Sequence, residues 1–326
     1  MRPSGWRSSP AVAARSWPGS RIGLPTTPAR HSTCRGNLRS ISPWTRASPN
    51  TCARSEGSEV KAGLATIALR KYDVFAAVDF ARDAGFDGVE IWGKPPHTPE
   101  ELDEDHTRRI RDRARANGLE VPVFGSYVNP SWPEYEQKSA DAIRIALLLG
   151  AKIIRVWAGG KEPHEADDDL WRHVASSFHE FALRAEYEGL TLAVETHGGT
   201  LAFTPEGALR LIEMAEAPNL KLNYQPGDFA SPCVERDIEL VGDYVAMVHA
   251  QNFRPSCTEP EKMVRSTIEK GTVDYDYALS LLAGHGFNGY VEVEFLKGED
   301  VSEAAMLESM QRDAAYLKQI TARHSL

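Results

Sequence analysis

A repeating alternation of short apolar runs with helical patterns is the feature that most restricts what this chain can fold into. From Val60 onward, runs rich in β-branched residues alternate with amphipathic stretches about every 25 to 40 residues, which is typical of a parallel sheet covered by helices. Eight strand candidates occur in order, at residues 63–69, 88–93, 121–128, 153–158, 191–197, 221–225, 245–251 and 290–295. The sequence therefore predicts an α/β protein.

Apolar residues between the strand candidates recur with helical spacing. One predicted helix face consists of Val74, Ala77, Val78 and Ala81, and comparable sets begin at Ile143, Leu170, Tyr275 and Leu307. Glycines stand where helices should end, at positions 85, 118, 150, 189 and 286. Eight such units in about 265 residues predict a (β/α)8 TIM barrel. A doubly wound open sheet is the alternative, but no Gly-x-Gly-x-x-Gly or Walker loop follows the first strand candidate.

Residues 1–58 differ from the rest of the chain. They mix Arg, Ser and Pro with isolated Trp and have no apolar period, which predicts disorder. Their prolines would interrupt the amphipathic helix that an organelle transit peptide forms, so we favour a start site placed too far upstream. The predicted organisation is an N-terminal extension at 1–58, disordered or absent from the native protein, and a TIM barrel at 59–326.

The charge distribution argues against several classes of function. The net charge is −9, yet the first 60 residues hold nine Arg, and residues 61–326 carry 28 basic against 44 acidic side chains. A body of this charge repels nucleic acid. The longest aliphatic run, 145–149, is far shorter than the roughly 18 to 20 residues of a membrane helix. Four cysteines without metal or disulfide spacing favour a reducing, cytoplasmic location.

Three side chains with metal-binding chemistry share one predicted position. In a barrel strand alternate residues face the interior, and the carboxyl ends of the strands build the site. This parity directs Glu195, His249 and Glu294 inward at the ends of the fifth, seventh and eighth strands. Two carboxylates and an imidazole suit Mn²⁺, Mg²⁺ or Co²⁺, and Zn²⁺ less well. Single strand-end residues of these types are usually structural, but three at matching depth predict a metal centre.

Several motifs resemble those of a known superfamily. They are GFDGVEI at 85–91, IRVWAG at 154–159, VETHGG at 194–199, VHA at 248–250 and GFNGYVEVE at 286–294. With these motifs residues 60–326 resemble the sugar phosphate isomerase/epimerase superfamily of xylose isomerase-like TIM barrels. That superfamily includes ketose 3-epimerases, hydroxypyruvate isomerase, inosose dehydratase and endonuclease IV-like enzymes.

The resemblance implies a metal site built from Glu, Asp, His and Glu on strands five to eight. It assigns the ligands Glu195, Gln225, His249 and Glu294, with Gln225 standing where an Asp is usual. A glutamine oxygen can bind a hard cation but brings no charge. Asp228, in the loop after Gln225, is the alternative fourth ligand. The basic residue usual after the strand-seven histidine is absent, and Arg254 is the nearest substitute.

The resemblance also implies the chemistry. We expect a metal-dependent isomerase or epimerase that acts on a sugar or related polyol by proton abstraction next to a metal-bound carbonyl, with Glu195 and Glu294 as the catalytic carboxylates. The expected substrate-binding residues are Trp92, Trp157, His197, Asp228 and Arg254. A dehydratase of the inosose or dehydroshikimate type is the alternative. A metal-free ligand-binding barrel and an endonuclease IV-like nuclease fit less well, and a homo-oligomer is expected by analogy.

Overall fold

The computed structural model describes residues 59–226, 233–294 and 302–325. The predicted extension at 1–58 therefore lies outside the described residues, as does Asp228. Within the described part, no helix is both long enough and apolar enough to cross a bilayer.

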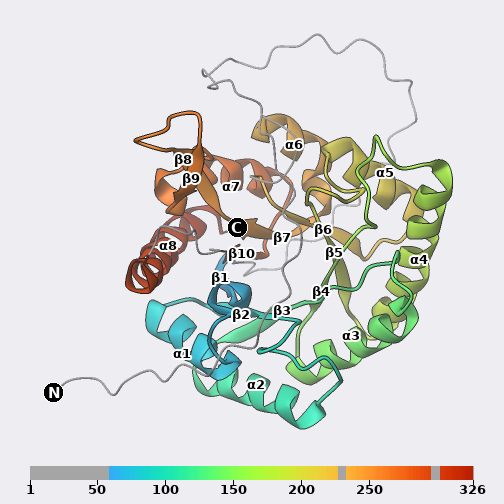
Figure 1. Ribbon diagram of the computed structural model, residues 1–326, viewed down its shortest axis with the longest axis horizontal. Helices are drawn as coiled ribbons and strands as arrows, with labels where there is room; N and C mark the ends of the chain where they lie inside the picture. Colours follow the sequence, from blue (N-terminus) through green and yellow to red (C-terminus); the bar gives the residue numbers. More distant parts are fainter. Residues whose placement is uncertain (1–58, 227–232, 295–301, 326) are drawn as a thin grey trace.

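Eight parallel strands close into a barrel in the order β1-β10-β7-β6-β5-β4-β3-β2 (Figure 1). All eight predicted strands are present. Their bounds are β1 Lys61–Ala65, β2 Gly88–Trp92, β3 Glu120–Gly125, β4 Ile153–Val156, β5 Thr191–Glu195, β6 Leu220–Tyr224, β7 Val245–Ala250 and β10 Tyr290–Val293. The prediction of a (β/α)8 TIM barrel is thus confirmed.

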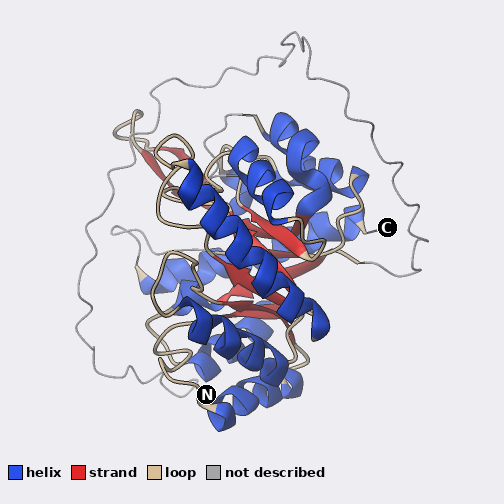
Figure 2. Ribbon diagram, turned by 90° about the vertical axis from the view of Figure 1, so that its right-hand side faces the viewer, coloured by secondary structure: helices blue, strands red, loops and turns tan. Residues whose placement is uncertain are grey.

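Helices surround the barrel and cover the outer face of its strands (Figure 2). They are α1 Val74–Ala84, α2 Glu104–Ala116, α3 Tyr135–Leu149, α4 Asp168–Tyr187, α5 Pro205–Ala215, α6 Val234–Val241, α7 Tyr275–Gly284 and α8 Glu303–His324. Short 3₁₀ helices occupy Thr66–Leu69, Gly242–Tyr244 and Ile268–Lys270. The apolar core fills the space between the strands and the helices, because the outward strand residues and the inward helix faces are buried together.

The helix ends follow the local chemistry of the sequence. Asp73 begins α1, where its carboxylate accepts hydrogen bonds from the backbone N–H groups of Phe75 and Ala76 at 3.0 Å each. Gly85 ends the same helix with φ of 85°, a conformation that a residue with a β-carbon adopts at a cost. The other glycines predicted to end helices, at positions 118, 150, 189 and 286, also have positive φ.

Two segments differ from the prediction. Residues 66–69 form a 3₁₀ helix rather than the end of the first strand, because the Thr66 hydroxyl accepts a hydrogen bond from the Trp92 backbone at 2.9 Å and turns the chain out of the sheet. Between β7 and α7 the chain forms an antiparallel hairpin, β8 Asn252–Pro255 with β9 Met263–Ser266, which projects from the barrel (Figure 1). The sequence reading did not predict this hairpin.

The inside of the barrel has an apolar floor below a polar layer. Val123, Ala193 and Met247 pack together as a small separate cluster, with Ile153 against it. Nearby, Gly63 of β1 faces Glu292 of β10 so closely that a β-carbon at this glycine would lie 2.7 Å from the Glu292 side chain. The absence of a side chain at Gly63 makes room for Glu292 of the neighbouring strand β10.

Candidate metal centre

Six ionisable side chains meet inside the barrel. They point inward from the strands or from the residue that follows a strand, and each is at most 6 % exposed: Glu90, Arg155, Glu195, His249, Glu292 and Glu294. The strand register explains their meeting. His249 of β7 lies beside Glu292 of β10. Arg155 of β4 lies beside Ala193 of β5, which precedes Glu195 by two residues. Buried charges at this density require mutual pairing.

The three predicted metal ligands come together. Glu195, His249 and Glu294 each offer a ligand atom, and these atoms lie within 4.8 Å of one another. His249 Nδ1 lies 3.5 Å from Glu294 Oε2 and has no hydrogen-bond partner among the described residues. An enclosed imidazole nitrogen without a partner, flanked by two carboxylates, fits a divalent cation.

Both oxygens of Glu195 are already engaged. The Arg155 guanidinium donates to Oε2 through Nη1, and the Gln225 amide donates to Oε1 through Nε2 at 2.8 Å. The Gln225 oxygen accepts instead from Gln251, at 3.4 Å. Gln225 therefore lies next to the cluster, but its amide must turn before its oxygen can bind a cation there, as its predicted role requires.

Glu90 holds the imidazole of His249 from below. Its Oε2 lies 2.8 Å from His249 Nε2, and its Oε1 accepts from Arg155 Nε at 3.0 Å. A hydrogen bond at Nε2 orients the ring and directs Nδ1 towards Glu195 and Glu294. Glu90, His249 and Glu292 form a second group whose ligand atoms also lie within 4.8 Å of one another.

Burial and pairing shift the pKa values of this cluster. Burial alone would raise the pKa of Glu90, but Arg155 and then His249 hold that pKa at about 2. Burial opposes the charged form of His249, yet Glu90 and Glu294 raise its pKa well above the usual range. The pKa of Glu294 is lowered, because His249 outweighs the effect of burial. Burial and the neighbouring Glu90 raise the pKa of Glu292 well above its usual range.

Aromatic side chains form a wall beside the cluster. The Trp92 indole N–H donates to the Tyr127 hydroxyl at 2.9 Å, and the rings of Tyr127 and Trp157 stack with centroids 5.6 Å apart. His197 lies against Trp157, with ring centroids 4.8 Å apart, and its Nδ1 donates to the Gly198 carbonyl at 2.7 Å. The structure thus groups Trp92, Trp157 and His197, three of the predicted substrate-binding residues.

Of the other two predicted substrate-binding residues, Arg254 is not in this group. Arg254 is exposed on β8, where its guanidinium contacts the Pro255 carbonyl and the Cys257 sulfur at 3.3 Å each. Asp228 lies outside the described residues, so its prediction as an alternative ligand is untested.

Sequence reasoning gave no role to Glu90, although a signal for it exists. In β2 the buried Val89 and Ile91 face the helices, which leaves Glu90 on the inner face by the same parity that identified Glu195. Arg155 lies on the inner face of β4 by the same parity, but its pairing with both Glu90 and Glu195 depends on the reach of a long side chain across the barrel.

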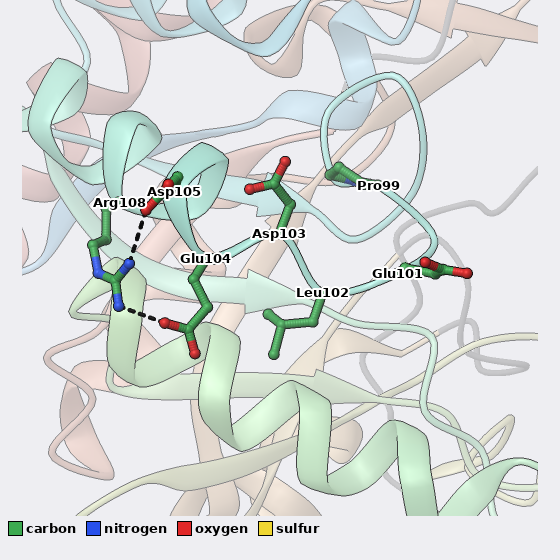
Figure 3. A pocket seen from close by; sticks show the side chains of 7 residues that line it. All are labelled: Pro99, Glu101, Leu102, Asp103, Glu104, Asp105 and Arg108. Carbon is green, nitrogen blue, oxygen red and sulfur yellow. Dashed lines mark hydrogen bonds and ion pairs between the residues drawn. The ribbon is translucent and has the colours of Figure 1, made fainter.

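A surface hollow lies elsewhere, ahead of α2 (Figure 3). It is lined by Pro99, Glu101, Leu102, Asp103, Glu104, Asp105 and Arg108. Arg108 already pairs with Glu104 at 2.5 Å and with Asp105 at 3.1 Å, and these side chains are more than a third exposed. The hollow therefore has none of the buried, convergent polar groups that mark the barrel centre.

Comparison with known proteins gives one family match and several distant relatives. Residues 78–320 match the family described as xylose isomerase-like TIM barrel. A 3-dehydroshikimate dehydratase from Bacillus anthracis is 24% identical over 170 residues, which are 50% of this chain and only 61% of that protein. An inosose dehydratase from Clostridium perfringens is 23% identical over 301 residues, 81% of this chain and 98% of that protein.

A solved structure shows the same fold. It is a xylose isomerase-like TIM barrel protein from Mycobacterium smegmatis in complex with magnesium, with a TM-score of 0.66 and 17% identity. The similarity covers 82% of this chain and 98% of that one.

Proposed function

Because this chain belongs to the xylose isomerase-like TIM barrel family, we propose that it is a metal-dependent enzyme that removes a proton next to a carbonyl group of a polyol-like substrate. The observation that carries this proposal is the meeting of Glu195, His249 and Glu294 around the unpartnered Nδ1 of His249. These three residues would hold the cation, and Gln225 is positioned to join them.

When bound, a divalent cation would supply a positive charge that polarises the substrate carbonyl and acidifies the neighbouring C–H. Oxygen and imidazole donors favour Mg²⁺, Mn²⁺ or Co²⁺. The magnesium in the Mycobacterium smegmatis protein supports a cation of this kind.

The two candidate catalytic carboxylates are not equivalent. Glu195 accepts hydrogen bonds from Arg155 and Gln225, which engage both of its oxygens. Glu294 faces only His249 among these groups, at 3.5 Å. Because its carboxylate accepts no hydrogen bond from Arg155 or Gln225, Glu294 is the candidate for contacting the substrate C–H, whereas Glu195 is held in position by its two donors.

One free base favours the loss of water over epimerisation. Epimerisation needs a second group that returns the proton from the opposite side, whereas dehydration needs one base and one acid for the leaving hydroxyl. His197 is the candidate for that acid, because its Nδ1–H is fixed by the Gly198 carbonyl and its Nε2 remains available to the substrate. In this reaction Glu294 takes a proton from carbon, a C–O bond breaks, a C=C bond forms, and His197 protonates the departing hydroxyl.

We therefore propose a dehydratase acting on a cyclic hydroxy-ketone. The two curated relatives described above, both dehydratases, support this choice. An isomerase or epimerase is the second candidate, and the presence of two carboxylates in one cluster favours it.

An assay in D₂O separates these reactions. The Mn²⁺-loaded protein is mixed with 3-dehydroshikimate and with inosose, and mass spectrometry follows loss of water and uptake of deuterium at carbon. A dehydratase removes water from one of these substrates, and Glu294→Gln lowers the rate at least about 100-fold. The exposed Glu308→Gln is the matched control. Deuterium exchange or isomerisation without loss of water would contradict a dehydratase and support the second candidate.

A further inference from the structure

Lys94 is a cation beside the candidate site that has no acidic partner. It follows β2 by two residues, at the carboxyl end of the barrel where the site lies, and it is partly buried. Its Nζ lies 3.7 Å from the centroid of the Tyr127 ring. No carboxylate of the described residues lies within ion-pair distance of it, although acidic side chains outnumber basic ones in this chain.

The other cation nearby is fully committed. Arg155, whose guanidinium carbon lies 5.4 Å from the same Tyr127 centroid, pairs with both Glu90 and Glu195. Burial and then the proximity of Arg155 lower the pKa of Lys94. A partly buried ammonium group next to another cation is stabilised by a bound anion.

A second group beside Tyr127 also lacks a partner. The indole N–H of Trp157 is enclosed and has no hydrogen-bond partner among the described residues. Trp157 stacks on Tyr127 with ring planes 16° apart, so Lys94 and Trp157 both lie against the Tyr127 ring. A buried donor without a partner favours a site that a ligand or water completes.

We propose that Lys94, with the Trp157 N–H, forms an anion subsite that recognises a carboxylate on a ring-shaped substrate. This inference rests on the proposed function and narrows its substrate class from cyclic hydroxy-ketones in general to those that carry a carboxylate. One unpaired ammonium group matches the single charge of a carboxylate better than a doubly charged phosphate.

Binding of unreactive ring compounds tests this subsite apart from turnover. Shikimate is a ring polyol with a carboxylate, myo-inositol is a neutral ring polyol, and neither has the ketone that the proposed reaction needs. Calorimetry with the Mn²⁺-loaded protein should show shikimate binding at least about 10-fold tighter than myo-inositol, with inorganic phosphate competing poorly. Lys94→Gln should abolish this preference, and Lys94→Arg should retain most of it.

Lys71→Gln is the matched control, since Lys71 is an exposed lysine in the loop after β1 at the same end of the barrel. It should leave shikimate affinity unchanged. Trp157→Phe, which keeps the ring and removes the N–H, should weaken shikimate binding and leave that of myo-inositol unaltered. The subsite would be overturned if Lys94→Gln bound shikimate as tightly as the parent protein does. It would also be overturned if the parent bound shikimate and myo-inositol equally, did not bind shikimate, or preferred phosphate. If the parent binds shikimate as expected but removes water from neither substrate in the D₂O assay, the proposed reaction is refuted and the subsite is not.

Discussion

At the scale of single residues, Gln225 sets the charge of the candidate metal centre. It donates to Glu195 where the family resemblance implies an aspartate, so the centre has one negative charge fewer than that pattern. Gln225→Asp should lower the melting temperature without metal, because it places a carboxylate beside Glu195. It should tighten Mn²⁺ binding by about 10-fold or more through Coulomb attraction. Calorimetry and thermal melting measure the two effects.

The companion variant for this prediction is Asp228→Asn. If Gln225 is the fourth ligand, Asp228→Asn binds Mn²⁺ as the parent does. Should Asp228→Asn alone lose Mn²⁺ affinity, the fourth ligand is Asp228, and the role given to Gln225 is wrong.

If His249 is a metal ligand as proposed, Glu90 positions it. Its carboxylate lies 2.8 Å from His249 Nε2 and fixes the ring whose Nδ1 faces the cluster. Glu90→Gln keeps the size of the side chain but replaces a charged acceptor, so Mn²⁺ affinity should fall by roughly 10-fold to 100-fold. Isothermal calorimetry checks this against Glu308→Gln, and an affinity equal to that of the parent would show that Glu90 does not position His249.

At the scale of elements, the alternation of strand and helix patterns predicted every barrel strand, because each strand and helix has its own apolar period. The same parity predicted the meeting of Glu195, His249 and Glu294. Parity says which face a residue takes, but it does not say how far a long side chain reaches, so the Arg155 bridge between β2 and β5 was not predictable. The β8–β9 hairpin was missed because β8 reads as a short polar segment, Asn252–Pro255, with two exposed residues.

The contact between α8 and the segment after β9 has a pH dependence of its own. Asp313 of α8 is buried and accepts a hydrogen bond from the Ile268 backbone at 2.7 Å, and burial raises its pKa to about 7. A carboxyl group with a higher pKa in the folded state than in the unfolded state contributes to the free energy of unfolding. This contribution is fully present below the unfolded pKa of about 4. That contribution is lost as the pH rises through 7.

Asp313→Asn should therefore flatten the dependence of unfolding free energy on pH between about 4 and 7, because asparagine keeps an oxygen acceptor for Ile268 and does not titrate. Urea unfolding across this pH range gives the slopes of the two proteins. Identical slopes in parent and variant would mean that Asp313 is ionised in the folded state.

At the scale of the whole molecule, the barrel interior combines an apolar floor with a buried polar layer above it. Val123, Ala193 and Met247 close the floor, and the six ionisable groups above them hold one another at the carboxyl ends of the strands. Because this buried layer excludes water, the local dielectric constant is low, and each electrostatic interaction between the paired groups is stronger than it would be in water. Within this layer Glu195 and Glu294 place two carboxylates beside the imidazole of His249, which is the arrangement proposed to hold a cation.

The central claim is that Glu195, His249 and Glu294 hold a divalent cation. Calorimetric titration of Mn²⁺ into the parent protein and into Glu294→Gln tests it most directly. The parent should bind one Mn²⁺ and release protons on binding at neutral pH, because the pKa of His249 is raised and Nδ1 must lose its proton to become a ligand. Glu294→Gln should bind at least about 10-fold more weakly. Equal Mn²⁺ affinity in the two proteins, or no binding by the parent, would contradict the account.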